Sequence, residues 1–169
     1  MKKFLTLIFL VCFSTTNFAQ KSNDSLPKIT KLILFRHAEK NDTSNDPELS
    51  EKGKLRAQKL SDLFVDLKID ELYSTPYNRT KQTLAIVATE KGLKIETYNP
   101  SDISFSTTLL ENNLGKTALI VGHSNTIPNL VNLLIDEKKY KHLEENEFGK
   151  IWILTFSDKN LIDCILLNY

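Results

Sequence analysis

The chain is poor in cysteine, histidine and glycine. Its 169 residues include 2 Cys, 3 His and 5 Gly. Cys12 lies in an apolar run near the N-terminus, and Cys164 is the only cysteine in the rest of the chain, so an internal disulfide is excluded there. No cysteines and histidines are grouped with the spacing of a zinc site, and we expect no bound metal.

A strong net charge of either sign is also missing. The 22 Lys and Arg residues almost balance the 21 Asp and Glu residues, which gives a formal charge of +1 at pH 7. Such a chain has no electrostatic footprint for nucleic acid or for an anionic membrane. A length of 169 residues with 41% hydrophobic residues is typical of one globular domain that buries a core without disulfides.

The N-terminus has the pattern of a secretory signal peptide. Lys2 and Lys3 precede an apolar stretch over residues 4–13, which is too short to cross a bilayer as a helix. Small and polar residues follow at 14–19, and cleavage is expected after Ala19. A buried N-terminal helix is the alternative interpretation of this run.

Three segments are therefore expected: a signal peptide over 1–19, a flexible polar lead over 20–30 and one domain over 31–169. Removal of the signal leaves 20 basic and 21 acidic residues, so the mature domain is nearly neutral. We expect a secreted or periplasmic protein with no stable membrane insertion after the signal is removed. No feature of the sequence defines an oligomeric state.

Short apolar runs alternate with amphipathic segments along the domain. Together with turn residues and caps, this pattern predicts strands at 31–35, 71–74, 94–98, 116–121, 151–156 and 161–167, and helices at 50–67, 78–91, 103–114 and 126–135. The alternation predicts the α/β class: a three-layer α/β/α sandwich with a mostly parallel central sheet and helices on both faces. The last two strands are expected to form an antiparallel edge.

Rare and charged residues follow three of these strands. Arg36 and His37 follow the first strand, Arg79 comes shortly after the second, and His123 follows the fourth. The chain has only three arginines and three histidines, so most of them lie at strand ends. Because ligand sites in such sheets form outside the carboxyl ends of the strands, these four side chains are expected to share one crevice.

Four groups that can carry positive charge repel one another unless an anion lies between them. The planar guanidinium of arginine matches phosphate oxygens in a bidentate fashion. A histidine can attack phosphorus and carry a covalent intermediate, while fixed cations stabilise the charge on the transferring phosphoryl group. The cluster therefore predicts a phosphoryl-transfer site.

Each residue alone has a simpler interpretation. Arg36 could be a surface charge, His37 a structural histidine, His123 a helix cap, and Arg79 part of a surface ion pair of about 0.5 kcal/mol. All of these simpler interpretations would have to be true at once, at three separate strand ends. A single phosphate site explains the same residues together and is therefore favoured. Residues 122–124, Gly-His-Ser, are loosely similar to a serine-hydrolase elbow, but the second glycine of that motif is absent.

Three motifs in order resemble the histidine phosphatase superfamily, which includes cofactor-dependent phosphoglycerate mutases and many phosphatases. They are Arg-His-Ala-Glu at 36–39, Ser-Thr-Pro at 74–76 followed by Arg79 and Gln82-Thr83, and Val-Gly-His-Ser at 121–124. The resemblance runs from about residue 31 to residue 135 and covers most of the mature chain.

The resemblance implies a role for each matching residue. His37 would be the nucleophile that forms a phosphohistidine, and Arg36 and Arg79 would clamp the phosphoryl oxygens. His123 would add a hydrogen-bond donor, and Ser124 would contact the substrate. Water would then hydrolyse the phosphohistidine, and no metal or organic cofactor is implied.

The proton donor for the leaving group is the main departure from the family pattern. Larger members carry an acid in an insertion after the second arginine, but residues 80–122 here are filled by a helix, a strand and a short helix. The length is closer to that of the compact phosphohistidine-phosphatase-like members. Asp102 is the first candidate for a proton donor and Glu39 the second. Phosphoramidates and aryl phosphates would need no such acid.

The sequence thus predicts a phosphatase that hydrolyses phosphomonoesters or phosphoramidates through a phosphohistidine on His37. A small phosphorylated molecule or a phosphoprotein is the expected partner, and nucleic acid is not. The alternatives are a non-catalytic phosphate-binding module and a phosphotransferase or mutase of the same family. The acidic run at 144–147 and the neighbouring His142 are expected to be solvated surface.

Overall fold

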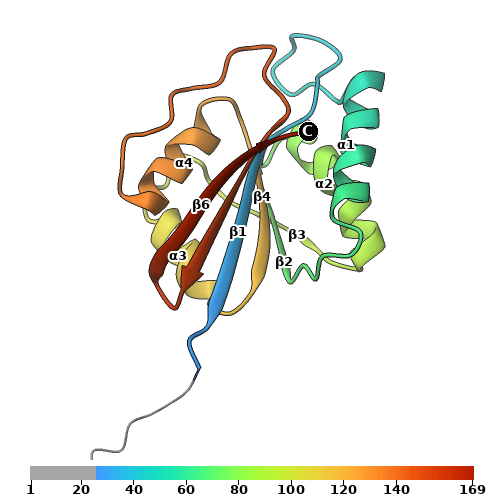
Figure 1. Cartoon of the computed structure of the whole chain (residues 1–169). Helices are drawn as coiled ribbons and strands as arrows, with labels where there is room; N and C mark the ends of the chain where they lie inside the picture. The colour runs from blue at the N-terminus through green and yellow to red at the C-terminus, as the bar shows by residue number, and fades with distance from the viewer. Residues whose placement is uncertain (1–25) are drawn as a thin grey trace, which may run out of the picture.

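The computed structural model describes residues 26–169, so the predicted signal peptide lies outside the described residues. Six strands and four helices alternate along the chain (Figure 1). Their bounds are β1 Ile29–Arg36, α1 Glu51–Leu63, β2 Glu71–Ser74, α2 Asn78–Lys91, β3 Ile95–Thr97, α3 Phe105–Asn112, β4 Thr117–Gly122, α4 Thr126–Ile135, β5 Lys150–Ser157 and β6 Asn160–Asn168.

All six strands form one sheet in the order β3-β2-β4-β1-β5-β6. The pairs β2–β3, β2–β4 and β1–β4 are parallel, whereas β5 pairs antiparallel with β1 and β6 pairs antiparallel with β5. The predicted mostly parallel sheet with an antiparallel pair of final strands is confirmed. This order makes β1, β4 and β2 direct neighbours, so the three motif-bearing strand ends lie side by side.

Helices lie on both faces of the sheet, with α1 and α2 on one face and α3 and α4 on the other (Figure 1). Successive residues of β1 alternate between the two cores: Leu32 and Leu34 pack in the core under α4, while Ile33 and Phe35 pack in the core under α1 and α2. Burial on both faces explains why this strand is a continuous apolar run. The predicted three-layer sandwich is confirmed.

The helices do not cover the β6 edge, although both faces of the sheet were expected to be covered. Eight of the nine residues of β6 are exposed. Strands β5 and β6 follow the last helix and are joined by a tight turn, so no helical crossover packs over them. The exposed apolar side chains of this strand are Leu161, Ile162, Ile165, Leu166 and Leu167.

The first strand begins before the predicted end of the flexible lead at residue 30. Ile29 and Thr30 belong to β1 and pair with Ser157 and Phe156 of β5. Thr30 is also fully buried and accepts a hydrogen bond from the backbone N–H of Gly115. The boundary was misplaced because this pairing partner comes from the distant end of the chain, which a local pattern does not reveal.

Gly53 allows the loop after β1 to pass very close to α1. Ser50 caps the helix by accepting from the Gly53 N–H at 3.1 Å, and the Ser50 N–H donates to the Glu39 carbonyl at 2.9 Å. A Cβ added at Gly53 would lie 2.1 Å from that same Glu39 oxygen. A glycine near the start of the helix is therefore a requirement of the close approach, and the loop it accommodates begins directly after His37.

We expect Gly53→Ala to lower the free energy of unfolding by about 1–3 kcal/mol, because backbone has to move to make room for the methyl group. The same movement should displace His37 and reduce kcat. Urea unfolding and initial-rate kinetics measure the two effects. Gly92→Ala is a useful comparison, since its Cβ would meet nothing within 4 Å and only its positive φ of 64° opposes it. A Gly53→Ala protein with unchanged kinetics would contradict this role.

Candidate active site

The ends of β1 and β4 are held in register beside each other. Arg36 pairs with Gly122, and the His37 N–H donates to the Gly122 carbonyl at 2.9 Å. The chain therefore brings His37 and His123 together just beyond the sheet. Their rings meet edge to face with centroids 5.4 Å apart.

A pocket of about 380 Å³ opens at this edge. Its lining includes all five residues that the motifs predicted for catalysis or phosphate binding, namely Arg36, His37, Arg79, His123 and Ser124. A volume in this range suits a small ligand or a side chain that carries a phosphoryl group. The lining is mainly polar and cationic, as a site for a phosphoryl anion requires.

His37 is held as a neutral imidazole. Its Nδ1 lies 2.7 Å from the Ala38 carbonyl, and because a carbonyl only accepts, Nδ1 carries the proton and Nε2 keeps its lone pair. Burial lowers the pKa of His37 to about 3; the hydrogen bond to Ala38 opposes this shift, and the positive charges of Arg36 and Arg79 add to it. The imidazole is consequently uncharged at neutral pH.

His123 is linked to the β2–α2 turn and to the second arginine. Its Nε2 lies 3.0 Å from Thr75 Oγ1, and its Nδ1 lies 3.5 Å from Arg79 Nη2. Arginine only donates, so Nδ1 accepts there, and Nε2–H donates to Thr75. Burial, with Arg79 and Arg36 adding to it, lowers the pKa of His123 to about 4. A bound phosphoryl anion favours the protonated ring, which can then donate from Nδ1.

These lowered pKa values predict a stability that decreases in mild acid. Below pH 6.5 the unfolded chain takes up a proton at His37, whereas the folded protein does so only near pH 3. The unfolded state then binds more protons, so the free energy of unfolding falls with falling pH. From pH 7 to pH 5, we expect His37→Asn to lose about 2 kcal/mol less stability than the wild type.

Urea unfolding at both pH values measures this difference, and ¹⁵N-edited NMR titration of the imidazoles reads the pKa of His37 directly. The same dependence on pH in His37→Asn and in the wild type would contradict a neutral, buried His37.

Arg36 is almost fully buried and is anchored by the main chain of the loop before β5. Its Nη1 donates to the carbonyls of Glu144, Glu145 and Glu147 at 2.8, 3.2 and 3.1 Å. The guanidinium carbon lies 4.1 Å from the centroid of the Phe148 ring. Its Nε is buried and has no hydrogen-bond partner in the part of the chain that the structure describes. An unpartnered buried donor beside a pocket is what a bound anion would satisfy.

Arg79 reaches the same pocket from the start of α2. Its guanidinium carbon lies 4.4 Å from the centroid of the Tyr77 ring, and Nη1 donates to the Asn45 carbonyl at 3.3 Å. Asp46 Oδ1 lies 3.8 Å from Nη1 and also accepts from the Asn78 N–H at 2.7 Å. The polar loop over residues 41–48 therefore helps to orient the second arginine.

The two predicted proton donors lie outside this pocket. Two hydrogen bonds of 2.8 Å join the Glu39 carboxylate to Arg56. Burial alone would raise the pKa of Glu39, but the hydrogen bonds from Arg56 outweigh it and lower the pKa to about 2. Asp102 lines a neighbouring hollow, where Oδ1 accepts from the Ser104 N–H and hydroxyl at 2.9 and 2.7 Å. Neither carboxyl is placed to protonate a leaving group in the pocket.

Other residues of the site were not predicted. Lys40, Tyr77 and Glu145 line the pocket, and the Phe148 ring lies edge to face with His37 at 6.1 Å between centroids. Lys40 directly follows the first motif and Tyr77 directly follows Ser-Thr-Pro of the second. Their position in the sequence could therefore have identified them as pocket residues. Glu145 belongs to the acidic run that was expected to be solvated surface; its side chain is exposed, but the main chain of this run binds Arg36.

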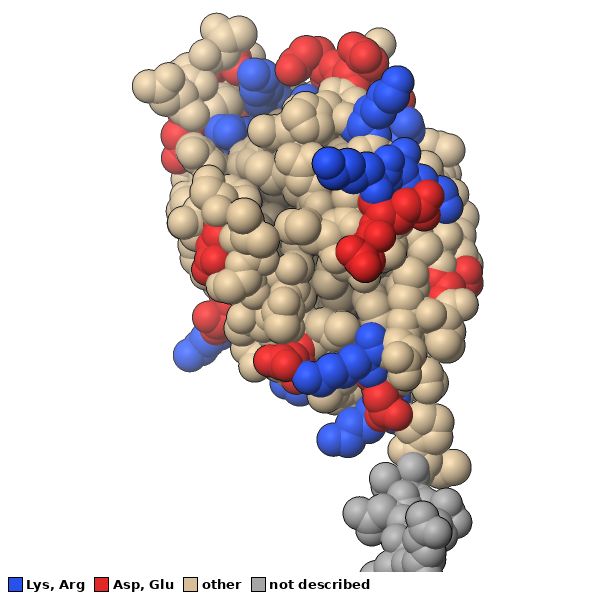
Figure 2. Space-filling view, turned by 90° about the vertical axis from the view of Figure 1, so that its left-hand side faces the viewer, with Lys and Arg blue, Asp and Glu red and all other residues tan. Residues whose placement is uncertain are grey.

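No metal site or membrane-spanning helix is found over residues 26–169. No group of three or more His, Cys, Asp or Glu side chains in this range could hold a metal ion. The helices in the same range are too short or too polar to span a bilayer. On the face seen in Figure 2, basic and acidic side chains are interspersed, and neither sign forms a broad patch.

Comparisons with known proteins agree with this geometry. A family model described as histidine phosphatase superfamily (branch 1) matches residues 32–99. Phosphoserine phosphatase 1 of Hydrogenobacter thermophilus is 38% identical over 74 residues, a match that covers 40% of this chain and 35% of that protein. The match thus spans about a third of the length of this curated relative. The residues that the family model matches include the first two motifs but not the segment around His123.

Solved structures share the fold over nearly their whole length. The protein histidine phosphatase SixA complexed with tungstate superposes with a TM-score of 0.66 at 17% identity, covering 82% of this chain and 96% of that chain. A phosphoserine phosphatase from Entamoeba histolytica has a TM-score of 0.63 at 20% identity, covering 83% and 97%. The matched family model, together with the two arginines and two histidines in one pocket, shows that the chain resembles the histidine phosphatase superfamily, and the solved structures show the shared fold.

Proposed function

We propose that this protein is a phosphatase that hydrolyses phosphomonoesters or phosphoramidates through a covalent phosphohistidine on His37. One observation carries the proposal: a neutral His37 with a free Nε2 lies 5.4 Å from the ring of His123, in a pocket that both arginines line. A nucleophile, a phosphate clamp and a second imidazole are thereby assembled without help from another molecule.

The chemistry follows from this arrangement in two steps. The phosphoryl group binds between Arg36 and Arg79, and the unpartnered Nε–H of Arg36 gains an acceptor. Nε2 of His37 attacks phosphorus as the bond to the leaving group breaks, and the leaving group takes up a proton. Water then attacks the phosphohistidine, which releases inorganic phosphate and restores neutral His37.

The two alternatives fit less well. A phosphate-binding module needs the arginines but has no need for a histidine held as a neutral nucleophile, so the hydrogen bond from Nδ1 to Ala38 favours catalysis. A mutase must retain its bound substrate while the phosphoryl group is transferred to the enzyme and back. It must also keep water away from the phosphohistidine during that time. The chain between Arg79 and His123 is taken up by α2, β3 and α3, which leaves no insertion there to close over the pocket.

The substrate is a small phosphorylated molecule or a phosphoprotein. A related protein named phosphoserine phosphatase and a similar fold named protein histidine phosphatase support these two classes. The open pocket accepts a phosphorylated side chain as well as a free metabolite. The lysine pair and apolar run at the N-terminus support a secreted or periplasmic location for this activity.

Hydrolysis of p-nitrophenyl phosphate by residues 20–169 tests the proposal. We expect turnover that persists in EDTA and that inorganic phosphate inhibits. Transfer of the phosphoryl group to an added alcohol, measured against release of phosphate, separates a phosphatase from a phosphotransferase. Absence of turnover with every phosphomonoester and phosphoramidate tried, together with a rise in Tm on adding phosphate, would identify a binding module.

A further inference from the structure

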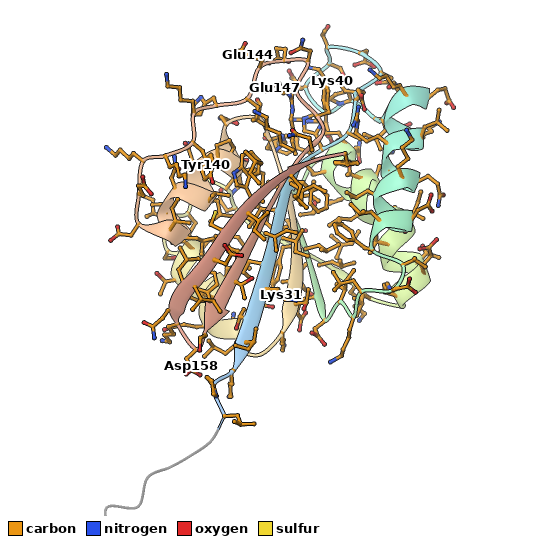
Figure 3. All side chains as sticks on the ribbon, viewed as in Figure 1. Lys31, Lys40, Tyr140, Glu144, Glu147 and Asp158 are labelled. Carbon is orange, nitrogen blue, oxygen red and sulfur yellow. The ribbon has the colours of Figure 1, made fainter. Side chains whose placement is uncertain are left out.

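The acidic loop, defined as residues 143–148, is attached to the catalytic groups at several points. The Leu143 N–H donates to the Ser124 carbonyl at 2.9 Å, and three carbonyls of the loop accept from Arg36. At its other end Phe148 contacts both Arg36 and His37. Figure 3 shows Glu144 and Glu147 at the same end of the sheet as Lys40, which lines the pocket. The loop is thus a wall of the active site.

Glu145 is the acid that this wall presents to the pocket. It is the only Asp or Glu lining the pocket among the described residues. Its Oε2 lies 3.6 Å from Arg36 Nη2, while its side chain is 86% exposed. Glu147, in contrast, is used within the loop: its two oxygens bind Lys150 and the Glu144 N–H, each at 2.8 Å. Within residues 26–169 the Glu145 carboxyl has no such structural partner besides Arg36.

An acid in this place answers a chemical need of the reaction. An alkyl phosphate releases an alkoxide, which is a poor leaving group unless a proton reaches its oxygen as the P–O bond breaks. Glu39 is held as a carboxylate by Arg56, and Asp102 is bound to Ser104 outside the pocket. The wall formed by the acidic loop therefore carries the carboxyl that can reach the bridging oxygen of a bound substrate.

We propose that Glu145 is the proton donor to the leaving group, an inference that rests on the proposed phosphatase function. As His37 Nε2 forms its bond to phosphorus, the P–O bond breaks and the Glu145 proton passes to the departing oxygen, giving an alcohol and a carboxylate. In the second step the carboxylate takes a proton from the attacking water, whose oxygen bonds to phosphorus as the P–N bond breaks. Each turnover returns Glu145 to its protonated form.

The position of Glu145 gives it access to both Arg36 and water. Its carboxyl faces Arg36 Nη2 at 3.6 Å. A phosphoryl group that binds Arg36 therefore lies next to this carboxyl, where its leaving oxygen can meet a proton donor. The exposed side chain is accessible to water, while the main-chain bond of Glu145 to Arg36 keeps it at the pocket.

Glu145→Gln tests the proposal, with p-nitrophenyl phosphate and glycerol 2-phosphate as substrates. Nitrophenolate leaves without a proton, so kcat/KM for p-nitrophenyl phosphate should change less than about threefold. In contrast, kcat/KM for glycerol 2-phosphate should fall by about 100-fold. Glu137→Gln makes the same change of charge at an exposed site outside the pocket and should leave both rates unchanged.

The outcomes separate this proposal from the function on which it rests. An equal loss with both substrates would assign Glu145 to phosphate binding, and no loss with either would remove it from the reaction; both results overturn the proposal. Absence of turnover in the wild type with both substrates would instead contradict the phosphatase itself. Activity of Glu145→Asp on glycerol 2-phosphate above that of Glu145→Gln would support the carboxyl as donor.

Discussion

We expect His37→Asn to lower kcat for p-nitrophenyl phosphate by about 10⁴-fold or more, because the covalent route is lost with the attacking nitrogen. The good leaving group makes this test independent of any proton donor. Asparagine keeps a polar side chain of similar reach, which can hydrogen-bond to the Ala38 carbonyl as Nδ1 does. The fold should therefore remain, and the loss should lie in kcat.

Phosphate binding provides the control for that variant. Both arginines remain, so inorganic phosphate should still raise the Tm of His37→Asn. Removal of His142, which is exposed and outside the pocket, should leave kcat unchanged. A His37→Asn protein that keeps more than about a tenth of the wild-type kcat would show that another group attacks phosphorus.

Removal of either arginine should cost about 10³-fold or more in kcat/KM, since cations that bind the transferring phosphoryl oxygens contribute on this scale. The two positions differ in their effect on stability. Arg36 donates to three carbonyls of the acidic loop and stacks on Phe148, so Arg36→Ala should also lower the free energy of unfolding by about 2 kcal/mol.

Arg79→Ala should change stability by no more than about 0.5 kcal/mol, because its contacts are one carbonyl, a long ion pair and an aromatic face near the surface. Urea unfolding and steady-state kinetics of the two variants make the comparison. Arg79→Lys should not restore activity, since an ammonium cannot donate two parallel bonds to a phosphoryl group. Equal stability of the Arg36 and Arg79 variants would contradict the anchoring of the loop by Arg36.

The sequence predicted the sheet and the meeting of the motifs because both depend on local patterns. The apolar run before Arg36 indicated a strand buried on both faces, and the strand order then placed β1, β4 and β2 together. Proline and glycine marked the ends of several elements, as Gly92 does for α2 in its left-handed conformation. These signals are short-range, and they were sufficient to predict that Arg36, His37, Arg79 and His123 share one pocket.

The proton donor and the walls of the pocket could not be predicted in the same way. Glu39 was a candidate because it adjoins His37 in sequence, but its side chain turns to Arg56 on α1. The acidic loop looked like solvated surface because its charged side chains do face water. Its function in the site comes from main-chain carbonyls that bind Arg36, more than a hundred residues earlier, and residue type carries no signal for such bonds.

Trapping the covalent intermediate tests the central claim most directly. The protein would be mixed with a phosphomonoester for milliseconds, denatured in alkali, where phosphohistidine survives, and analysed by peptide mass spectrometry. The account predicts one added phosphoryl group on His37 in the wild type, none in His37→Asn, and a higher occupancy with p-nitrophenyl phosphate than with glycerol 2-phosphate in Glu145→Gln. Turnover with no phosphoryl group on His37 at any time point, or with the group on another residue, would contradict the account.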